Sequence, residues 1–212
     1  MSLNKEKNFV SAVVYLYNEE NSVKKFLTSL NELLKTNFEK YEIICVNDTS
    51  TDNTAKAVEE FCDENSVKSL TMIDTSFFQG VENAMVAGLD ISIGDFVFEF
   101  DSCLMDYEPT AIMEVYKKSL TGYDIVFGVP EGASKFSSRM FYKMFNKFSN
   151  MNYKIKTQRF SIISRRGINR VKSIGVRTVY RKAVYASCGL PATDYVYKPL
   201  ENGKRNDAQY PV

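Results

Sequence analysis

The feature that most constrains this chain is a repeated alternation of short apolar runs with amphipathic helical patterns. Near-continuous apolar runs predict strands that are buried on both faces, and apolar residues three and four apart predict helices. The predicted strands are residues 9–17, 41–46, 67–74, 95–100 and 123–129. The predicted helices are residues 18–35, a helix beginning near Asp52, and residues 79–92 and 109–120. Such strand–helix units predict an α/β fold in which helices cover both faces of a mostly parallel sheet.

The chain has 212 residues, which is enough for one sizeable α/β domain and short for two. No internal repeat or Pro/Gly-rich linker divides it. We therefore expect residues 1–131 to form the α/β core and residues 132–212 to be a basic part of the same domain. The first residues lack the apolar core of a secretory signal, and no run reaches the roughly 20 apolar residues of a membrane span. These features predict a cytoplasmic protein.

Histidine and cysteine usage excludes several kinds of chemistry. The chain has no histidine, so Ser-His-Asp and Cys-His nucleophiles, histidine bases and His-ligated zinc are excluded. Its four cysteines are widely spaced and include no Cys-x-x-Cys pair, which argues against a disulfide framework or a structural zinc site. Catalysis would have to use carboxylates, cations, hydroxyls or backbone dipoles.

Charge is divided sharply along the chain. Residues 1–131 hold 10 lysines and 23 acidic residues, whereas residues 132–193 hold 14 basic residues and no acidic residue. This asymmetry indicates a polyanionic or membrane-surface partner for the second segment. The alternative is a basic face that neutralises the acidic part within the folded chain.

Three polar clusters follow predicted strands. They are "YNEE" (17–20), "NDTSTDNT" (47–54) and "DSCLMD" (101–106). In open parallel sheets, ligands bind beyond the carboxyl ends of the strands, where the strand order reverses. We therefore expect the three clusters to meet at one edge of the sheet. The alternative for the second cluster is a helix-capping turn without a ligand.

Three longer stretches carry a family resemblance. They are "SAVVYLYNEENSV" (11–23), "YEIICVNDTSTDNTAKAVEEF" (41–61) and "GVENAMVAGLDISIGDFVFEFDSCLMDYEP" (80–109). In this order and spacing they resemble the family 2 glycosyltransferases of the GT-A fold, which use nucleotide-diphosphate sugars. "GYDIVFGVPEG" (122–132) and "QRFSIISRRGINRV" (158–171) are similar to the dolichyl-phosphate mannosyltransferase subgroup, which moves sugars onto lipid phosphates.

The resemblance implies a nucleotide site for a UDP- or GDP-sugar in residues 1–131. Tyr17 and Glu19 would lie along the base and ribose, and Asp48 would accept a hydrogen bond from the base. Asn47 can still bond a base, because an amide both donates and accepts. Ser50 completes the expected nucleotide-binding set.

The chain departs from the family pattern at Tyr15, Asn47, Thr49 and Cys103, where the family usually has Pro, Asp, Gly and Asp. By resemblance Asp101 would be the catalytic and metal-binding carboxylate, with Asp106 as a second ligand. A cysteine thiol is a soft ligand that is poorly matched to Mg²⁺. The sequence therefore leaves open a weak Mg²⁺ or Mn²⁺ site, a metal-free enzyme whose Lys or Arg neutralises the diphosphate, and a domain that no longer transfers sugar.

The basic segment bears on the acceptor. An acceptor hydroxyl needs a general base, whereas a lipid phosphate is already anionic and needs cations instead. We expect Arg159 to act in the catalytic centre, and Arg139, Arg165 and Arg166 to bind the acceptor phosphate, because guanidinium groups pair bidentately with phosphate. The alternative is that "SRRGINRVKSIG" (164–175) is a solvated helix face.

Residues 134–151 predict a basic amphipathic helix rich in Phe and Met, which could lie on a membrane surface or pack on the sheet. Nucleic-acid binding also fits a basic aromatic stretch, but the acidic strand-end loops argue against it. The family resemblance thus implies inverting sugar transfer to a polyprenyl phosphate or another glycan-pathway acceptor. The alternative is a degenerate domain that binds a nucleotide sugar or a partner. No pattern indicates an oligomeric state.

Overall fold

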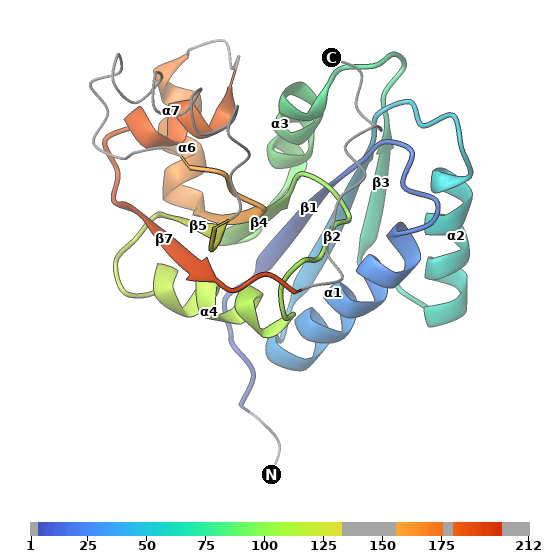
Figure 1. The fold of residues 1–212 in the computed structure, drawn as a ribbon, viewed down its shortest axis with the longest axis horizontal. Helices are drawn as coiled ribbons and strands as arrows, with labels where there is room; N and C mark the ends of the chain where they lie inside the picture. Colours follow the sequence, from blue (N-terminus) through green and yellow to red (C-terminus); the bar gives the residue numbers. More distant parts are fainter. Residues whose placement is uncertain (1–3, 133–155, 176–179, 201–212) are drawn as a thin grey trace.

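The computed structural model describes residues 4–132, 156–175 and 180–200. They form one seven-stranded sheet in the order β3-β2-β1-β4-β6-β5-β7, in which only β6 is antiparallel to its neighbours (Figure 1). The strands are β1 (Val10–Leu16), β2 (Tyr41–Asn47), β3 (Leu70–Asp74), β4 (Phe96–Phe100), β5 (Ile125–Pro130), β6 (Phe160–Ser164) and β7 (Ala192–Tyr197). The helices are α1 (Val23–Asn37), α2 (Thr54–Asn65), α3 (Val81–Ile91), α4 (Thr110–Ser119), α6 (Arg165–Ile174) and α7 (Arg181–Ser187).

Helices cover both faces of the sheet. Side chains of α1, α2 and α4 pack against one face, and those of α3, α6 and α7 pack against the other. Strand β1 is buried along its whole length, and its alternate residues serve the two layers: Val14 faces α1 and Val13 faces α3. Burial on both faces explains why the strand sequences are almost continuously apolar. The predicted fold class is confirmed.

Helix α3 lies unusually close to the sheet because a glycine faces it. A Cβ added at Gly88 would lie 2.4 Å from Val13 Cγ1 and 2.9 Å from Val46 Cγ2. Only a residue without a side chain allows this approach. The close packing holds the second half of α3 against β1 and β2.

The strand order reverses at β1, which pairs in parallel with β2 on one side and β4 on the other. In register, Val14 lies beside both Cys45 of β2 and Phe100 of β4. The segments that follow these three strands therefore leave the same edge of the sheet. This is the switch point at which ligands bind in open α/β sheets, and all three predicted polar clusters lie there.

The second part of the chain extends the same sheet. Strands β6 and β7 and helix α7 were not predicted from sequence, whereas the predicted strand 67–74 begins only at Leu70. Because β6 is antiparallel, Phe160 pairs with Phe100 and Ser164 pairs with Phe96. The segment after β6 therefore lies at the amino end of β4, away from the polar clusters.

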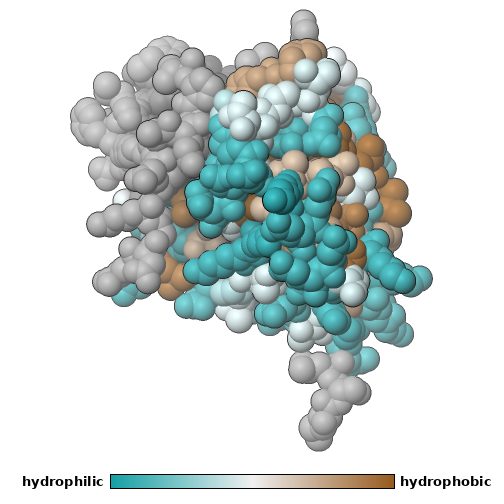
Figure 2. All heavy atoms as spheres, turned by 90° about the vertical axis from the view of Figure 1, so that its right-hand side faces the viewer, coloured by the Kyte–Doolittle hydropathy of each residue, from teal (hydrophilic) through white to brown (hydrophobic). Residues whose placement is uncertain are grey.

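Figure 2 shows the side of the molecule that carries α2, and hydrophilic residues cover much of its middle. Lys24 of α1 pairs there with Glu60 and Glu64 of α2, at 2.6 and 3.2 Å. Within the described ranges, no helix combines the length and the apolar character that crossing a bilayer requires. The predicted amphipathic helix 134–151 lies outside the described residues.

Candidate functional site at the switch point

Asp48 directly follows β2 and is completely buried. Its Oδ1 accepts hydrogen bonds from Thr75 Oγ1 at 2.9 Å and from the Gln79 backbone N–H at 2.8 Å. Its Oδ2 accepts from Tyr15 Oη at 3.0 Å and from the Gly80 backbone N–H at 2.8 Å. The carboxylate therefore anchors the loop of residues 75–80, which connects β3 to α3. The sequence prediction assigned Asp48 to the nucleobase, but in this structure its oxygens bond the protein.

The remainder of the second cluster is tied to the end of β1. Asn47 Nδ2 donates to Asp74 Oδ1 at 2.7 Å, and Asn47 Oδ1 accepts from the Ser50 backbone N–H at 3.3 Å. Ser50 Oγ in turn accepts from the Asn18 backbone N–H at 3.0 Å. Thr49, where the family usually has glycine, has a φ of +56°. A β-branched residue is strained in this conformation, and strained backbone often occurs at functional sites.

Aromatic side chains line the same edge. The Tyr17 ring packs edge-on against the Phe78 ring with centroids 4.9 Å apart. Phe77 and Phe78, on the loop that Asp48 anchors, are 65% and 43% exposed. Glu19 lies nearby, where its backbone N–H donates to Thr54 Oγ1 at 2.7 Å and its carboxylate accepts from Ser22 Oγ. An exposed aromatic pair beside hydrogen-bonding groups is suited to stacking a nucleobase.

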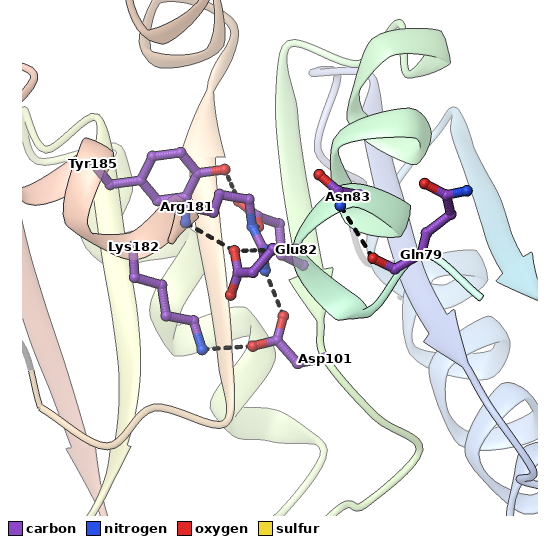
Figure 3. A network of polar contacts seen from close by, with 8 residues as sticks. Gln79, Glu82, Asn83, Asp101, Arg181, Lys182 and Tyr185 are labelled. Atoms are coloured by element: carbon purple, nitrogen blue, oxygen red, sulfur yellow. Dashed lines mark hydrogen bonds and ion pairs between the residues drawn. The ribbon is translucent and has the colours of Figure 1, made fainter. Parts of the chain in front are cut away.

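Asp101 directly follows β4 and belongs to a network of buried charges (Figure 3). Arg181, at the start of α7, is 1% exposed and contacts three carboxylates. It donates from Nε to Glu99 and from Nη2 to Asp101, both at 2.5 Å, and from Nη1 to Glu82 at 3.0 Å. Lys182 Nζ donates to the other Asp101 oxygen at 2.5 Å. Both oxygens of Asp101 therefore pair with cations.

The pKa values of Glu99, on β4, and Asp101, which follows it, shift in opposite directions. Burial alone would raise the pKa of Asp101, but Lys182 and Arg181 outweigh it and hold that pKa well below its usual range. Burial dominates at Glu99 and raises the pKa of its carboxyl, although Arg181 lies against it. Tyr185 of α7 donates to Glu99 Oε1 at 2.8 Å. Asp101 is thus held as an anion, and Glu99 is its deeply buried companion.

The start of α3 connects Asp48 to Asp101. The Gly80 backbone N–H donates to Asp48. Two residues later, in the first turn of α3, the Glu82 carboxylate accepts hydrogen bonds from the backbone N–H and the Nη1 of Arg181. Arg181 then bonds Asp101. The second and third polar clusters are therefore joined by direct contacts across one edge of the sheet.

Asp106 and Arg159 form a neighbouring pair. Arg159 Nε donates to Asp106 Oδ2 at 2.9 Å, and Tyr197 Oη donates to Asp106 Oδ1 at 2.7 Å. Arg159 immediately precedes β6, whose first residue pairs with Phe100, so this pair lies at the same edge as Asp101. The structure thus brings Arg159 to the predicted centre and commits both Asp106 oxygens to protein contacts.

The described residues do not form a ready site for a divalent metal. Both carboxylate oxygens of Asp101 and of Asp106 are engaged, and burial raises the pKa of the Cys103 thiol well above its usual value. In the described part of the chain, no three His, Cys, Asp or Glu side chains are grouped as metal ligands. A divalent ion on Asp101 would be repelled by the two cations that already pair with this carboxylate.

The structure does not bring Arg165 and Arg166 to this site. Arg165 Nε and Nη2 donate to the Gly94 carbonyl, at 3.0 and 2.8 Å, and Arg166 pairs with Asp124. Both follow β6 and lie at the amino end of β4, because β6 is antiparallel. The sequence prediction assigned these two arginines to the acceptor phosphate, and the reversed direction of β6 places both away from the switch-point edge. Arg139 lies outside the described residues.

Sequence reasoning missed Glu82, Glu99, Arg181 and Lys182. Glu99 carried a usable signal, because it interrupts the apolar run "FVFEF" of a strand that was predicted to be buried. A buried carboxylate requires a cation or strong donors. Nothing local in the sequence indicated that this cation would be Arg181.

A comparison with protein families decides the identity. The model of the family described as glycosyl transferase family 2 matches residues 11–187. The chain belongs to this family. Its sheet, its switch point and the predicted resemblance agree with that assignment.

Curated relatives within family 2 include an uncharacterized glycosyltransferase from Synechocystis, which is 31% identical over 190 residues and is matched over 87% of this chain and 59% of its own length. A prophage bactoprenol glucosyl transferase homolog from Escherichia coli is 27% identical over 188 residues, which cover 85% of this chain and 60% of that protein. The chain therefore spans about three-fifths of the length of these relatives.

Among solved structures, a mannosyltransferase from Pyrobaculum calidifontis in complex with GDP-Man and Mn²⁺ superposes with a TM-score of 0.73. It is 17% identical and is matched over 96% of this chain and 59% of its own chain. At this identity the likeness establishes the fold alone.

Proposed function

We propose that this family 2 domain transfers a sugar from a UDP- or GDP-sugar to a polyprenyl phosphate, with inversion at the anomeric carbon. The observation that carries the proposal is the contact chain from Asp48 through Gly80, Glu82 and Arg181 to Asp101 at the switch point. An edge built in this way offers a base-stacking end and a charged end. A nucleotide diphosphate has the same two parts.

The nucleotide would lie along the strand ends of residues 1–131, with its base on the Tyr17 and Phe78 rings. The exposure of Phe78 and its edge-on contact with Tyr17 support this placement. Glu19, Asn47 and Ser50 border the same edge and would contact the ribose and base. Asp48 would act mainly by holding the loop that carries Phe78.

The reaction would be a single displacement. An anionic oxygen of the acceptor phosphate attacks the anomeric carbon, and the bond from that carbon to the diphosphate breaks on the opposite side. The electron pair leaves with the nucleoside diphosphate, and no proton has to be removed from the acceptor. The protein's task is then to position the two reactants and to balance negative charge.

The basic segment 132–212 would bind the acceptor. Arg159 is well placed, because it lies at the same edge as Asp101, and it can exchange Asp106 for a phosphate oxygen. The names of relatives support a lipid phosphate: they include the bactoprenol glucosyl transferase homolog and an undecaprenyl-phosphate 4-deoxy-4-formamido-L-arabinose transferase from Proteus mirabilis. Docking on the inner membrane face through residues 134–151 belongs to the same proposal.

The test is a transfer assay with labelled UDP- and GDP-sugars and undecaprenyl phosphate in detergent micelles. We expect a lipid-linked sugar phosphate from at least one donor, and loss of most of this product in Arg159→Met. Binding of a nucleotide sugar without transfer or slow hydrolysis of any donor would contradict the enzymatic proposal. That outcome would favour a binding module instead.

A further inference from the structure

Lys182 is the cation on the more open side of the Asp101 carboxylate. Its Nζ lies 2.5 Å from Asp101 Oδ2, at the strand end next to the switch point (Figure 3). The Lys182 side chain is 10% exposed and that of Asp101 is 24% exposed, so the pair lies at the boundary between the interior and the open edge. It is therefore buried enough to be ordered and open enough for a ligand to reach it.

Arg181 and Lys182 differ in what they can offer a ligand. Arg181 is committed to Glu82, Glu99 and Asp101 and is almost completely buried. Among the described residues, Lys182 Nζ bonds a single carboxylate. An ammonium group has three donors, so two remain for phosphate oxygens while Asp101 still orients the group.

The contacts of Asp101 also favour a cation from the protein over a bound metal. Asp101 has no free oxygen for a metal, and its two partners are cations that would repel one. A diphosphate that arrives at this edge needs positive charge, and Lys182 already provides it without a metal. The Asp101 carboxylate accepts a hydrogen bond from this ammonium group and holds it in place.

We infer that Lys182 is the cation that neutralises the donor diphosphate, and that the donor therefore binds without a divalent metal. This inference rests on the proposed function and specifies how the same site holds its donor. Asp101 acts as a positioning residue for Lys182. On departure of the nucleoside diphosphate, the charge that develops on its oxygens faces the Lys182 ammonium.

The test is calorimetric titration of the full chain with UDP and with GDP, in EDTA and in excess MnCl₂. For the wild type we expect the preferred nucleotide to bind in EDTA within about twofold of its affinity in Mn²⁺. In Lys182→Gln we expect affinity in EDTA to fall by about tenfold, which corresponds to about 1.4 kcal/mol. Mn²⁺ should restore much of this loss, because the substitution frees one Asp101 oxygen and removes one repelling cation.

Two further variants make the comparison specific. Lys182→Arg retains the positive charge and should retain binding in EDTA. Lys172→Gln removes a lysine that pairs with Asp90 at 2.8 Å on the surface, and it should bind as the wild type does. Urea unfolding of each variant shows whether it is folded, and Arg181 still pairs with Asp101 in all of them.

Three outcomes would overturn the inference. Wild-type binding that requires Mn²⁺ would contradict it and leave the proposed function standing. If Lys182→Gln binds the nucleotide in EDTA as tightly as the wild type does, Lys182 is not the neutralising cation, and the proposed function still stands. Absence of binding of either nucleotide by the folded wild type, with or without Mn²⁺, would overturn the proposed function and this inference with it.

Discussion

Asp48 follows β2 and Asp101 follows β4, the two strands that flank β1, yet the surroundings of the two carboxylates differ in kind. Asp48 is completely buried and accepts four hydrogen bonds from two hydroxyls and two backbone N–H groups. Asp101 is partly exposed and is held by a guanidinium and an ammonium group. Neutral hydroxyl and backbone N–H donors satisfy Asp48 in the interior, whereas two cations satisfy Asp101 at the open edge of the sheet.

The two aspartates therefore have different tasks, although both follow strands at the same edge and the family resemblance makes both of them donor-site residues. Neutral donors around Asp48 fix the loop of residues 75–80 and hence the exposed ring of Phe78. Cations around Asp101 create a place where an incoming anion can compete for Lys182. We therefore regard Asp48 as a residue that shapes the site and Asp101 as a residue that sets its charge.

The largest expected effect comes from removing the cation at the centre of the network. Arg181→Met leaves Glu99 and Asp101 without their main buried partner, and loss of one partner of a buried pair costs about 3–5 kcal/mol. Urea unfolding at neutral pH measures this change. Lys172→Met is the matched control, since an exposed pair contributes about 0–1 kcal/mol. Equal effects of the two substitutions would show that burial of the network has little energetic importance.

Asp48→Ala should have the next largest effect. It leaves the N–H groups of Gln79 and Gly80 and two hydroxyls without their acceptor, and unsatisfied buried donors of this kind cost about 1–3 kcal/mol. The same denaturation experiment should place Asp48→Asn between the wild type and alanine, because its amide oxygen can still accept. If Asp48→Ala instead keeps wild-type stability and loses only nucleotide binding, Asp48 contacts the base and does not shape the loop.

The contribution of Asp101 should depend on pH. Its pKa is lower in the folded chain than in the unfolded chain, so its stabilisation is present above the unfolded value of about 3.9 and is lost as pH falls through the folded pKa. The free energy of unfolding of the wild type should exceed that of Asp101→Asn by about 1–3 kcal/mol at neutral pH. This difference should shrink as pH falls below about 4. A gap that stays constant across this range would rule out ion pairing as its source.

The fold and the location of the site could be read from the sequence to a large extent. Strands such as Val10–Leu16 are apolar throughout because both faces are buried, and the polar clusters follow strands whose carboxyl ends share an edge. Both inferences use local periodicity and one topological rule. They were sufficient to bring Asp48 and Asp101 to the same edge.

The partners of these carboxylates could not be read in the same way. Arg181 meets Glu82 and Glu99 across sequence separations of 99 and 82 residues, which no local pattern specifies. The short strand β6 lies within the basic segment, and its reversed direction carries Arg165 to the opposite edge. From the sequence, the charge asymmetry indicated an external partner or, alternatively, a basic face that neutralises the acidic part within the folded chain. Within the described residues, however, Arg159, Arg166, Lys172, Arg181 and Lys182 pair with acids of the first 131 residues.

A smaller effect is expected at the aromatic end. Phe78→Ala removes the exposed ring that packs against Tyr17, and stacking of a base on an aromatic side chain is worth about 1–3 kcal/mol. Affinity for the preferred nucleoside diphosphate should fall by about tenfold in calorimetric titration, with little change in the free energy of unfolding. Phe77→Ala is the neighbouring control on the same loop. If Phe77→Ala loses more affinity than Phe78→Ala, the base stacks on Phe77 and the assignment to Phe78 is wrong.

Amide hydrogen exchange with and without saturating nucleoside diphosphate tests most directly whether the strand ends bind the nucleotide. The account predicts slower exchange on binding in residues 17–22, 47–51, 75–82 and 101–106, and no change in residues 165–174 at the opposite edge. Protection confined to residues 165–174, or binding without protection at any of the strand-end segments, would contradict it.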